Sequence, residues 1–191
     1  NFEENLINYT AYSNGDLEKK CNLQYEDETI ISFDFSKYDL NNSYFGGVTF
    51  EKCVFSNVYL SGSNFGGSFL KDCILENNDN RKSIWDDIMI DNSKISEMDA
   101  FKSSFMYGKF HNIQFVRCNF EFNNFDGSEF MNVSFIDCNV NCVDFSKCKF
   151  SNVIFSGCKL ENVKFDENNK PKYYGRFNQG VVTLNLVDIA F

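Results

Sequence analysis

The sequence predicts an all-β fold in which the chain winds into stacked, four-sided coils. Two series of residues carry this prediction: large apolar residues recur at every fifth position, and small residues recur two positions before them. A period of five fits neither an α-helix nor an extended strand. Because the offset between the two series stays the same, the chain turns a corner every five residues, and four equal sides close a coil of about 20 residues.

Large apolar residues form the first series, which runs from Phe35 to Phe165. Of its 27 positions 26 are apolar and 16 are Phe, so that only Asn80 departs from the rule. In the second series 19 of 27 members are Ser, Val or Cys, which are small enough to let adjacent sides meet. We therefore expect about seven coils, stacked as parallel strands roughly 4.8 Å apart.

This pattern resembles the pentapeptide repeat family, as Cys53-Val54-Phe55 and Val143-Asp144-Phe145 illustrate. Polar residues also stand just before the centre, as in the family's consensus, at Asp34, Asn64, Asn119 and Asp144. The resemblance implies a right-handed quadrilateral β-helix over residues 33–167, and the handedness follows from the resemblance alone.

The four-sided coil also predicts which large residues lie above one another. One of the four resulting columns is wholly aromatic, and we expect it to form an internal stack of rings in the structural core. Its members are Phe45, Phe65, Trp85, Phe105, Phe125, Phe145 and Phe165.

Residues 1–32 depart from the repeat and are interpreted as an N-terminal β cap. Apolar segments between Leu6 and Tyr25 flank Asn14-Gly15, which is a strong hairpin turn signal. A cap of this kind would cover the first coil, whose open end is an unpaired strand edge.

Residues 168–191 are predicted to form a C-terminal β-hairpin that caps the last coil or pairs with a second chain to give a homodimer. Pro171 cannot donate to a strand ladder, so we expect it to end the stacking. The turn would lie at Asn178-Gln179-Gly180, and Val181 to Phe191 would form the returning strand.

The repeat is irregular near residues 76–83, where Asn78 and Asn80 occupy both inward positions. Burying two amides without partners costs a few kcal/mol, which favours a protruding loop. The alternative is an Asn pair that is hydrogen-bonded inside the coil.

The net charge is −9, which disfavours direct binding of nucleic acid because phosphate contacts need a basic surface. Acidic residues concentrate in 1–32 and in 72–99, and they would suit a basic partner or a protein surface that normally holds DNA. A second interpretation is that they keep a Phe-rich rod soluble. The candidate partner-binding residues are these acids of 72–99 and two outward aromatic residues: Asp72, Glu76, Asp79, Asp86, Asp87, Asp91, Glu97, Asp99, Phe101 and Phe122.

Six of the eight cysteines occupy the small inward position, where a thiol acts as a small apolar group. Cys142 instead faces outward, and a labelling reagent should reach it first. Free thiols favour a reducing compartment, so we expect a cytoplasmic protein. No apolar run is long enough to span a membrane and no targeting peptide is visible.

Enzymatic function finds no support, because catalytic and nucleotide-binding motifs are missing and His111 is the single histidine. We expect no catalytic residues, no metal and no cofactor. The leading hypothesis is a rigid rod for protein–protein interaction. The resemblance includes the Qnr-like group, which implies an acidic DNA mimic that binds a type II topoisomerase, DNA gyrase or topoisomerase IV, with activity in protruding loops. The rival hypothesis is a purely structural scaffolding module that assembles through its C-terminal strand.

Overall fold

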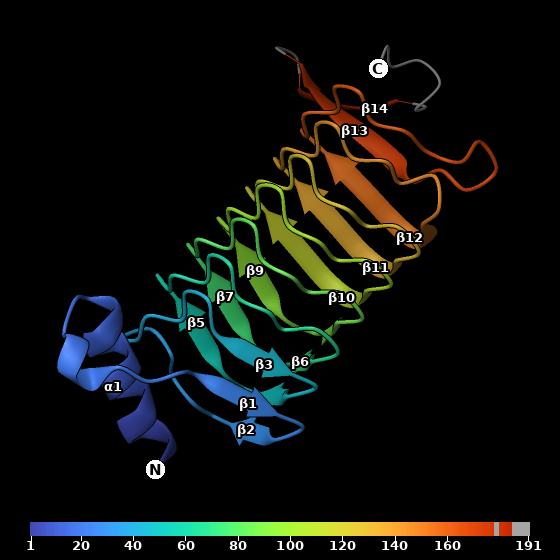
Figure 1. Ribbon diagram of the computed structural model, residues 1–191. Coiled ribbons are helices and arrows are strands. Elements are labelled where there is room, and N and C mark those ends of the chain that lie inside the picture. Colours follow the sequence, from blue (N-terminus) through green and yellow to red (C-terminus); the bar gives the residue numbers. More distant parts are fainter. Residues whose placement is uncertain (178–179, 185–191) are drawn as a thin grey trace.

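The computed structural model describes residues 1–177 and 180–184 and has the form of a rod (Figure 1). It is a parallel β-solenoid of about eight turns, which confirms the predicted all-β fold class. Strands of three residues form in the first coils: β1 (Gln24–Glu26), β2 (Thr29–Ile31), β3 (Tyr44–Gly46), β4 (Thr49–Glu51), β5 (Val54–Ser56), β6 (Phe69–Lys71), β7 (Ile74–Glu76), β8 (Met89–Asp91) and β9 (Lys94–Ser96). Longer strands follow: β10 (Lys109–Val116), β11 (Glu129–Ile136), β12 (Lys149–Ser156), β13 (Lys172–Phe177) and β14 (Gly180–Leu184).

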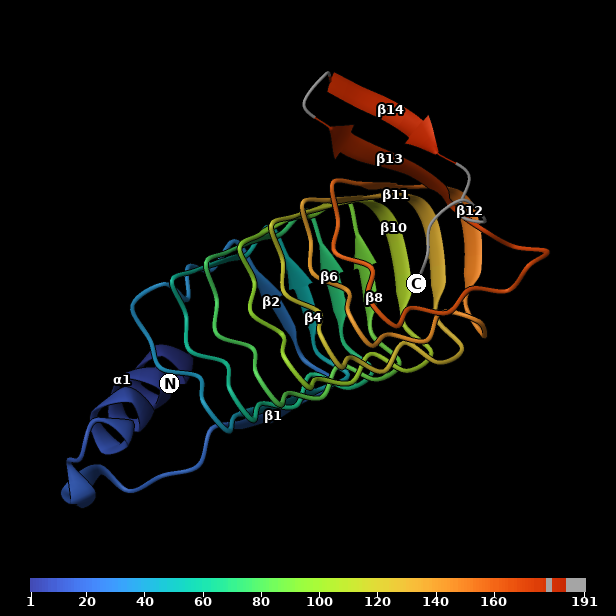
Figure 2. The same ribbon diagram turned by 90° about the horizontal axis from the view of Figure 1, so that it is seen from above.

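The coils stack in a constant register, in which Phe50 pairs with Leu70 and Val54 with Ile74. Isolated bridges keep the same register where no strand is assigned, as between Tyr59 and Asp79. Equivalent sides of the stacked coils form the four faces of the rod, and Figure 2 shows the coils. We number the faces by their central inward residues: face 1 from Tyr25 to Phe165, face 2 from Ile30 to Phe150, face 3 from Phe35 to Phe155, and face 4 from Leu40 to Leu160.

Aromatic rings fill the rod along face 1. Phe65 and Trp85 lie 4.5 Å apart between ring centroids, with their planes only 4° from parallel. Successive rings of the column continue at 6.0 Å or less to Phe165. Phe45 lies 5.1 Å from Phe65, and the ring of Tyr25 stacks on Phe45 at 5.7 Å. The seven predicted aromatic residues therefore form one continuous stack, and burial of their rings contributes to the hydrophobic stabilisation.

The small inward residues do more than leave room, because many of them donate a hydrogen bond to the coil before. Asn78 Nδ2 donates to the main-chain oxygen of Phe55 at 2.9 Å, and Ser128 Oγ donates to that of Phe105 at 2.7 Å. In each pair the acceptor lies 23 residues earlier. This bond explains why Ser, Cys and Asn share one position of the repeat: each is small and carries a donor.

Most corners of the coil have a left-handed backbone two residues after the centre. Glycine adopts this conformation without strain at Gly47 and Gly67, where φ is 65° and 68°. Asparagine is the next best residue there, as at Asn57. Tyr107 and Phe122 adopt the same conformation with φ of 57°, which is unusual for bulky side chains.

The N-terminal segment is a helix, so the predicted β cap over its first half is wrong. Helix α1 runs from Phe2 to Ser13, and a short 3₁₀ helix follows at Leu17–Lys19. Asn1 caps α1 by accepting from the amide of Glu3, and Leu6 and Tyr9 share its buried side. The Asn14-Gly15 pair ends this helix rather than joining two strands, because the apolar residues before it follow helical spacing.

The helix covers the open end of the first coil, which begins at β1 within residues 1–32. The ring of Phe2 packs edge-on against Tyr25 and Phe33 at 4.9 and 5.1 Å. The hydroxyl of Tyr38 donates to Glu3 at 2.7 Å. The predicted role of a cap is thus carried out by a helix, which protects the strand edge.

Residues 76–83 stay in the coil, and the predicted loop is not formed. Asp79 keeps its register with Tyr59 and Asp99, and the side chains of Asn78 and Asn80 are buried. Asn78 is hydrogen-bonded on both sides, because its Oδ1 accepts from the amide of Val58 at 3.0 Å. These bonds offset its desolvation, which is why no loop is needed there. Asn80 differs and is considered below.

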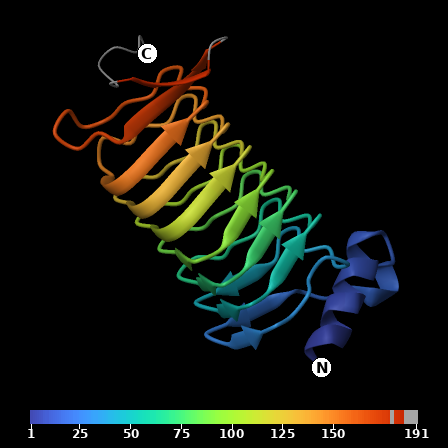
Figure 3. The same cartoon turned by 180° about the vertical axis from the view of Figure 1, so that it is seen from behind.

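The C-terminal strands extend the solenoid, and α1 and the β13–β14 hairpin lie at opposite ends of the rod (Figure 3). β13 pairs in parallel with β12, and β14 pairs with β13 in antiparallel orientation. Pro171 therefore does not end the stacking, although the register shortens there, since Ile154 pairs with Lys172. β13 can pair with β12 because Pro171 lacks only its own amide hydrogen, and the residues that follow it from Lys172 retain theirs. Asn178 and Gln179, and the end of the predicted strand from 185 to 191, lie outside the described residues.

In the described part of the chain, no helix is both long and apolar enough to cross a bilayer.

Candidate protein-binding surface

The acidic residues predicted to bind a partner are distributed around the rod, two to each face. Face 1 carries Asp86 and Asp87, face 2 Asp72 and Asp91, face 3 Glu76 and Glu97, and face 4 Asp79 and Asp99. The segment 72–99 covers more than one full coil, so neighbours in sequence point in different directions. These acids form a belt around the rod and no single patch.

Several members of the belt are paired with bases. Asp79 contacts Arg81 at 2.7 Å, and the hydrogen bonds from this guanidinium hold the pKa of Asp79 below its usual value. Glu97 contacts Arg117 at 2.9 Å. Such exposed pairs contribute less than about 1 kcal/mol each, but they reduce the negative charge available to a partner.

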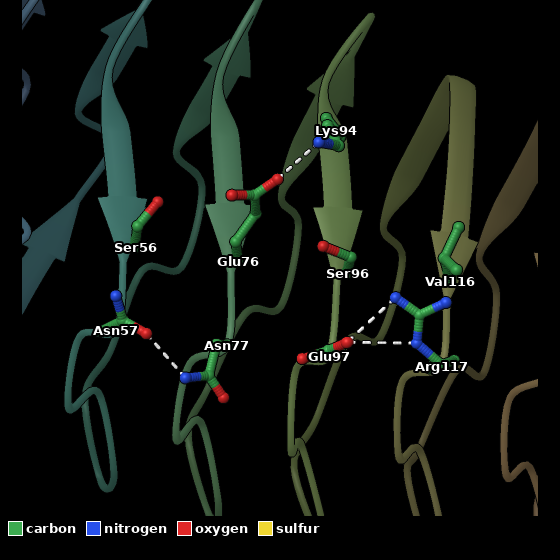
Figure 4. Close-up of a pocket in the computed structure, with 9 residues that line it drawn as sticks. All are labelled: Ser56, Asn57, Glu76, Asn77, Lys94, Ser96, Glu97, Val116 and Arg117. Carbon is green, nitrogen blue, oxygen red and sulfur yellow. Dashed lines mark hydrogen bonds and ion pairs between the residues drawn. The ribbon is translucent and has the colours of Figure 1, made fainter.

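A groove of about 470 Å³ runs along the junction of faces 3 and 4, where the two Glu residues of face 3 lie (Figure 4). Glu76 contacts Lys94 at 2.6 Å across its wall, and Asn77 Nδ2 donates to Asn57 Oδ1 at 2.6 Å. The Glu97–Arg117 pair closes its far end. Because its polar side chains bind one another, the groove has the character of a coil junction rather than of a ligand pocket.

Side chains of asparagines form a ladder of hydrogen bonds on the outer surface of the rod, along the edge of face 2. Asn92 Nδ2 donates to Asp72 Oδ1 at 2.6 Å, and Asn112 Nδ2 donates to Asp91 Oδ1 at 3.0 Å. Asn132 and Asn152 continue it, each donating to the Asn of the coil before. Asp72 and Asp91 are therefore acceptors in a structural ladder.

The fold itself gathers the negative charge on face 1. If the residue before each centre and the two after it are counted as outward, face 1 carries eight acids and two lysines, hence a net charge of −6. On each other face the numbers of acids and bases in the same count differ by at most one. The acids are Glu26, Asp27, Asp86, Asp87, Asp126, Asp144, Asp166 and Glu167, and the lysines are Lys147 and Lys164.

Local hydrogen bonds orient some of these carboxylates. Asp86 Oδ1 accepts from the amide of Met106 at 2.9 Å and from the hydroxyl of Ser104. Asp144 Oδ1 accepts from the amide of Ser146 at 2.9 Å, and hydrogen bonds from Ser146, first from its side chain, lower the pKa of Asp144. Only two members of the predicted set belong to this face. Counting charge along stretches of sequence misses it, and counting charge coil by coil at equivalent positions would have found it.

The two predicted aromatic residues meet on face 4. Phe101 and Phe122 pack edge to face with centroids 5.8 Å apart, and Lys102 Nζ lies 5.3 Å and 5.8 Å from the two rings. Phe122 remains 48% exposed. A cation over two rings is a favourable arrangement at a surface, and it covers part of their apolar area.

All eight cysteines are free thiols. The six inward ones are buried, and Cys142 is half-buried. Burial, together with hydrogen bonding to Cys118, raises the pKa of Cys138. No group of three or more His, Cys, Asp or Glu side chains in the described ranges is arranged to hold a metal ion.

Family models and solved structures agree with this architecture. A pentapeptide repeat region matches residues 108–170, and a model of pentapeptide repeats in eight copies matches residues 39–77. Together they cover more than half of the chain. No curated protein sequence matches it.

Solved structures resemble the chain at low sequence identity. HetL, a pentapeptide repeat protein involved in heterocyst differentiation regulation in the cyanobacterium Nostoc sp. strain PCC 7120, is 12% identical, with 82% of this chain and 94% of that chain covered and a TM-score of 0.40. A trypsin-treated form of QnrB1, a plasmid-mediated fluoroquinolone resistance protein, is 15% identical, with 76% and 92% covered and a TM-score of 0.34.

A third structure, the pentapeptide repeat protein Rfr23 from the cyanobacterium Cyanothece 51142, is 13% identical, with 84% and 99% covered and a TM-score of 0.25. These likenesses concern the repeat architecture and carry no information on function. The period of five, the four-sided coils and both family models lead to one conclusion: this chain is a member of the pentapeptide repeat family.

Proposed function

We propose that the protein is a non-enzymatic, rigid rod that binds another protein through the acidic surface of face 1. The observation that supports this proposal most directly is the segregation of charge, with −6 on face 1 and near neutrality on the other three. Scattered acids that serve solubility would have no reason to share one face.

The partner that this surface fits is a protein with a basic groove. A straight rod with fixed carboxylates presents negative charge along one line, as a nucleic acid does, and would attract a surface that normally holds DNA. DNA gyrase and topoisomerase IV are the specific partners that we propose, on the strength of the resemblance to the Qnr-like group. The loop over 76–83 that this resemblance implied is absent, so the acids of face 1 take its place in the proposal.

A DNA supercoiling assay with gyrase tests this proposal. The protein is titrated with and without a quinolone, and we expect protection or inhibition at low micromolar concentration. A triple variant, Glu26→Gln with Asp87→Asn and Asp144→Asn, should lose most of the effect. No effect of the native protein at a large molar excess would rule out gyrase as the partner.

The matched control removes the same amount of charge from other faces. Glu51→Gln, Glu129→Gln and Glu161→Gln together also neutralise three carboxylates, two on face 2 and one on face 4. We expect this variant to act like the native protein. Equal loss in both variants would indicate that net charge, rather than face 1, governs binding.

The second candidate function is a scaffold that assembles through its C-terminal end. β14 is the last strand of its sheet and pairs only with β13 among the described strands, so it offers an edge to a second chain. Deleting residues 172–191 should then reduce a dimer to a monomer in light scattering coupled to size exclusion, whereas a face 1 binder would keep its partner. We also propose a cytoplasmic location, which the unpaired thiols support.

A further inference from the structure

We propose that the core of the rod contains a site for ordered water beside Asn80, in the space that Ala100 leaves within face 4. The column of inward residues on this face runs Leu40, Leu60, Asn80, Ala100, Phe120. Asn80 is the only polar member of this column, and Ala100 is its smallest member. The two residues occupy adjacent coils.

Asn80 is buried without a partner for its side chain. It has 0% exposure, and neither Oδ1 nor Nδ2 has a hydrogen-bonding partner among the described residues. Its main chain is satisfied, since its amide donates to the oxygen of Asp99 at 2.8 Å and its oxygen accepts from Ser103 Oγ at 2.7 Å. Within Asn80, only the side-chain amide, which points into the interior, therefore lacks hydrogen-bonding partners among the described residues.

A third buried atom without a partner in the described part of the chain belongs to Asn123, whose side chain reaches the main chain of Ala100. Asn123 Nδ2 donates to the main-chain oxygen of Ala100, and Asn123 Oδ1 is buried without a partner among the described residues. Ala100 is therefore bordered by Asn80 in the coil before and by Asn123 in the coil after. Two acceptors and one NH₂ group, contributed by the coils on either side of Ala100, match what a buried water molecule requires, which is about two to four polar partners.

Asn78 shows that the position, and not the residue type, creates the site. This neighbouring Asn is also buried, and both ends of its amide are bonded to main-chain groups of the preceding coil, at Val58 and Phe55. Asn80 sits at a centre position, and neither end of its side-chain amide meets a main-chain group among the described residues. An amide there is satisfied only by something that enters the core, and Ala100 leaves room that Leu or Phe would fill.

NMR on the native protein provides the direct test. In a ¹⁵N-labelled sample, the side-chain amide of Asn80, identified by its loss in Asn80→Leu, should show NOE cross-peaks to long-lived water. The side-chain amide of Asn78 is the internal control and should show none. Absence of a water cross-peak at Asn80 would overturn the proposal.

A double-mutant cycle provides a second test. Ala100→Leu fills the space and strands the Asn80 amide, so we expect the melting temperature to fall by about 5 °C. In the Asn80→Leu background the same substitution completes an aliphatic column and should cost little. An equal fall in both backgrounds would overturn the proposal. Asn78→Leu, which strips two main-chain groups of their partner, should be destabilising, while Asn80→Leu alone should not.

Discussion

The thiol of Cys138 donates to the main-chain oxygen of Phe115, 3.3 Å away and 23 residues earlier in the chain. The same bond is made by Cys158 to Phe135 and by Cys148 to Phe125. It links the small inward residue of one coil to the large centre of the coil before. Side chains and main chain thus tie neighbouring coils together, and the strand ladder is only part of this connection.

The first prediction concerns this bond at Ser68, whose Oγ donates to the main-chain oxygen of Phe45. Ser68→Val keeps a small side chain but leaves that oxygen unpaired, and should lower the free energy of unfolding by about 1–3 kcal/mol. Ser68→Cys retains a donor and should cost less. Urea unfolding followed by circular dichroism measures both variants, and a Val variant as stable as the Cys variant would show that the bond contributes nothing.

The second prediction concerns thiol reactivity. Burial raises the pKa of Cys148 to about 12 and also raises the pKa of Cys138, so these groups stay protonated at pH 8. The thiolate is the reactive form. Cys142 and Cys21 are half-buried, and we expect a maleimide to modify these two first, with the inward six reacting only after unfolding. Mass spectrometry of a time course measures the order, and modification of Cys138 as fast as Cys142 would contradict the assignment of the inward series.

The third prediction concerns the corner at Gly127, where φ is +73°. A Cβ at this position would lie 2.5 Å from the ring of Tyr107, which lies over it. Gly127→Ala should therefore destabilise the rod by about 1–2 kcal/mol, from backbone strain and from the ring together. In a Tyr107→Asn background the loss should be smaller. Thermal melts of the four proteins measure the difference, and equal losses would assign the whole effect to the backbone.

The fourth prediction concerns pH. Hydrogen bonds from Arg81 lower the pKa of Asp79 in the folded state, so this pair stabilises the fold above the unfolded pKa of Asp79 and ceases to do so as pH falls through the folded value. Asp79→Asn should then reduce stability at pH 7, by less than about 1 kcal/mol because Arg81 is half exposed. Below both pKa values the two proteins should unfold alike. A deficit of the variant that persists at low pH would point to packing instead of charge.

The fifth prediction concerns the helical cap. Deleting residues 1–22 uncovers Phe33 and the edge of the first coil, which Phe2 protects. We expect the truncated protein to self-associate, because an open strand edge with apolar side chains is a template for pairing. Light scattering at increasing concentration measures this, with Ile7→Ser, on the exposed side of α1, as a control that should remain like the native protein. A truncated protein that stays monomeric would show that the helix is not needed to protect the edge.

Most of the fold follows from the repeat between Phe35 and Phe165, because a period that admits one large residue per side dictates the coil, its register and the aromatic column. The N-terminal helix is harder to predict for a specific reason. Asn14-Gly15 is compatible with a hairpin turn and with a helix end, and the spacing of Phe2, Leu6 and Tyr9 decides between the two.

The site is less predictable than the fold, because contact partners depend on which residues the coils bring above one another. Asn78 and Asn80 are both predicted to point inward, yet only Asn78 meets main-chain groups of the previous coil. Likewise Asp86 and Asp144 are distant in sequence and share face 1, while Asp86 and Asp91 point from different faces.

The constant register between coils has a consequence for how such a chain can change in length. Insertion of one complete coil lengthens the rod and leaves every face as it was, whereas insertion of a single repeat rotates all later coils by a quarter turn. In the second case the period is unbroken and the core stays filled, but Asp126 and Asp144 would move away from the line of Asp86. Inheritance of the fold and inheritance of the acidic face are therefore separable, and pentapeptide repeat proteins of equal stability can differ in which surface they present.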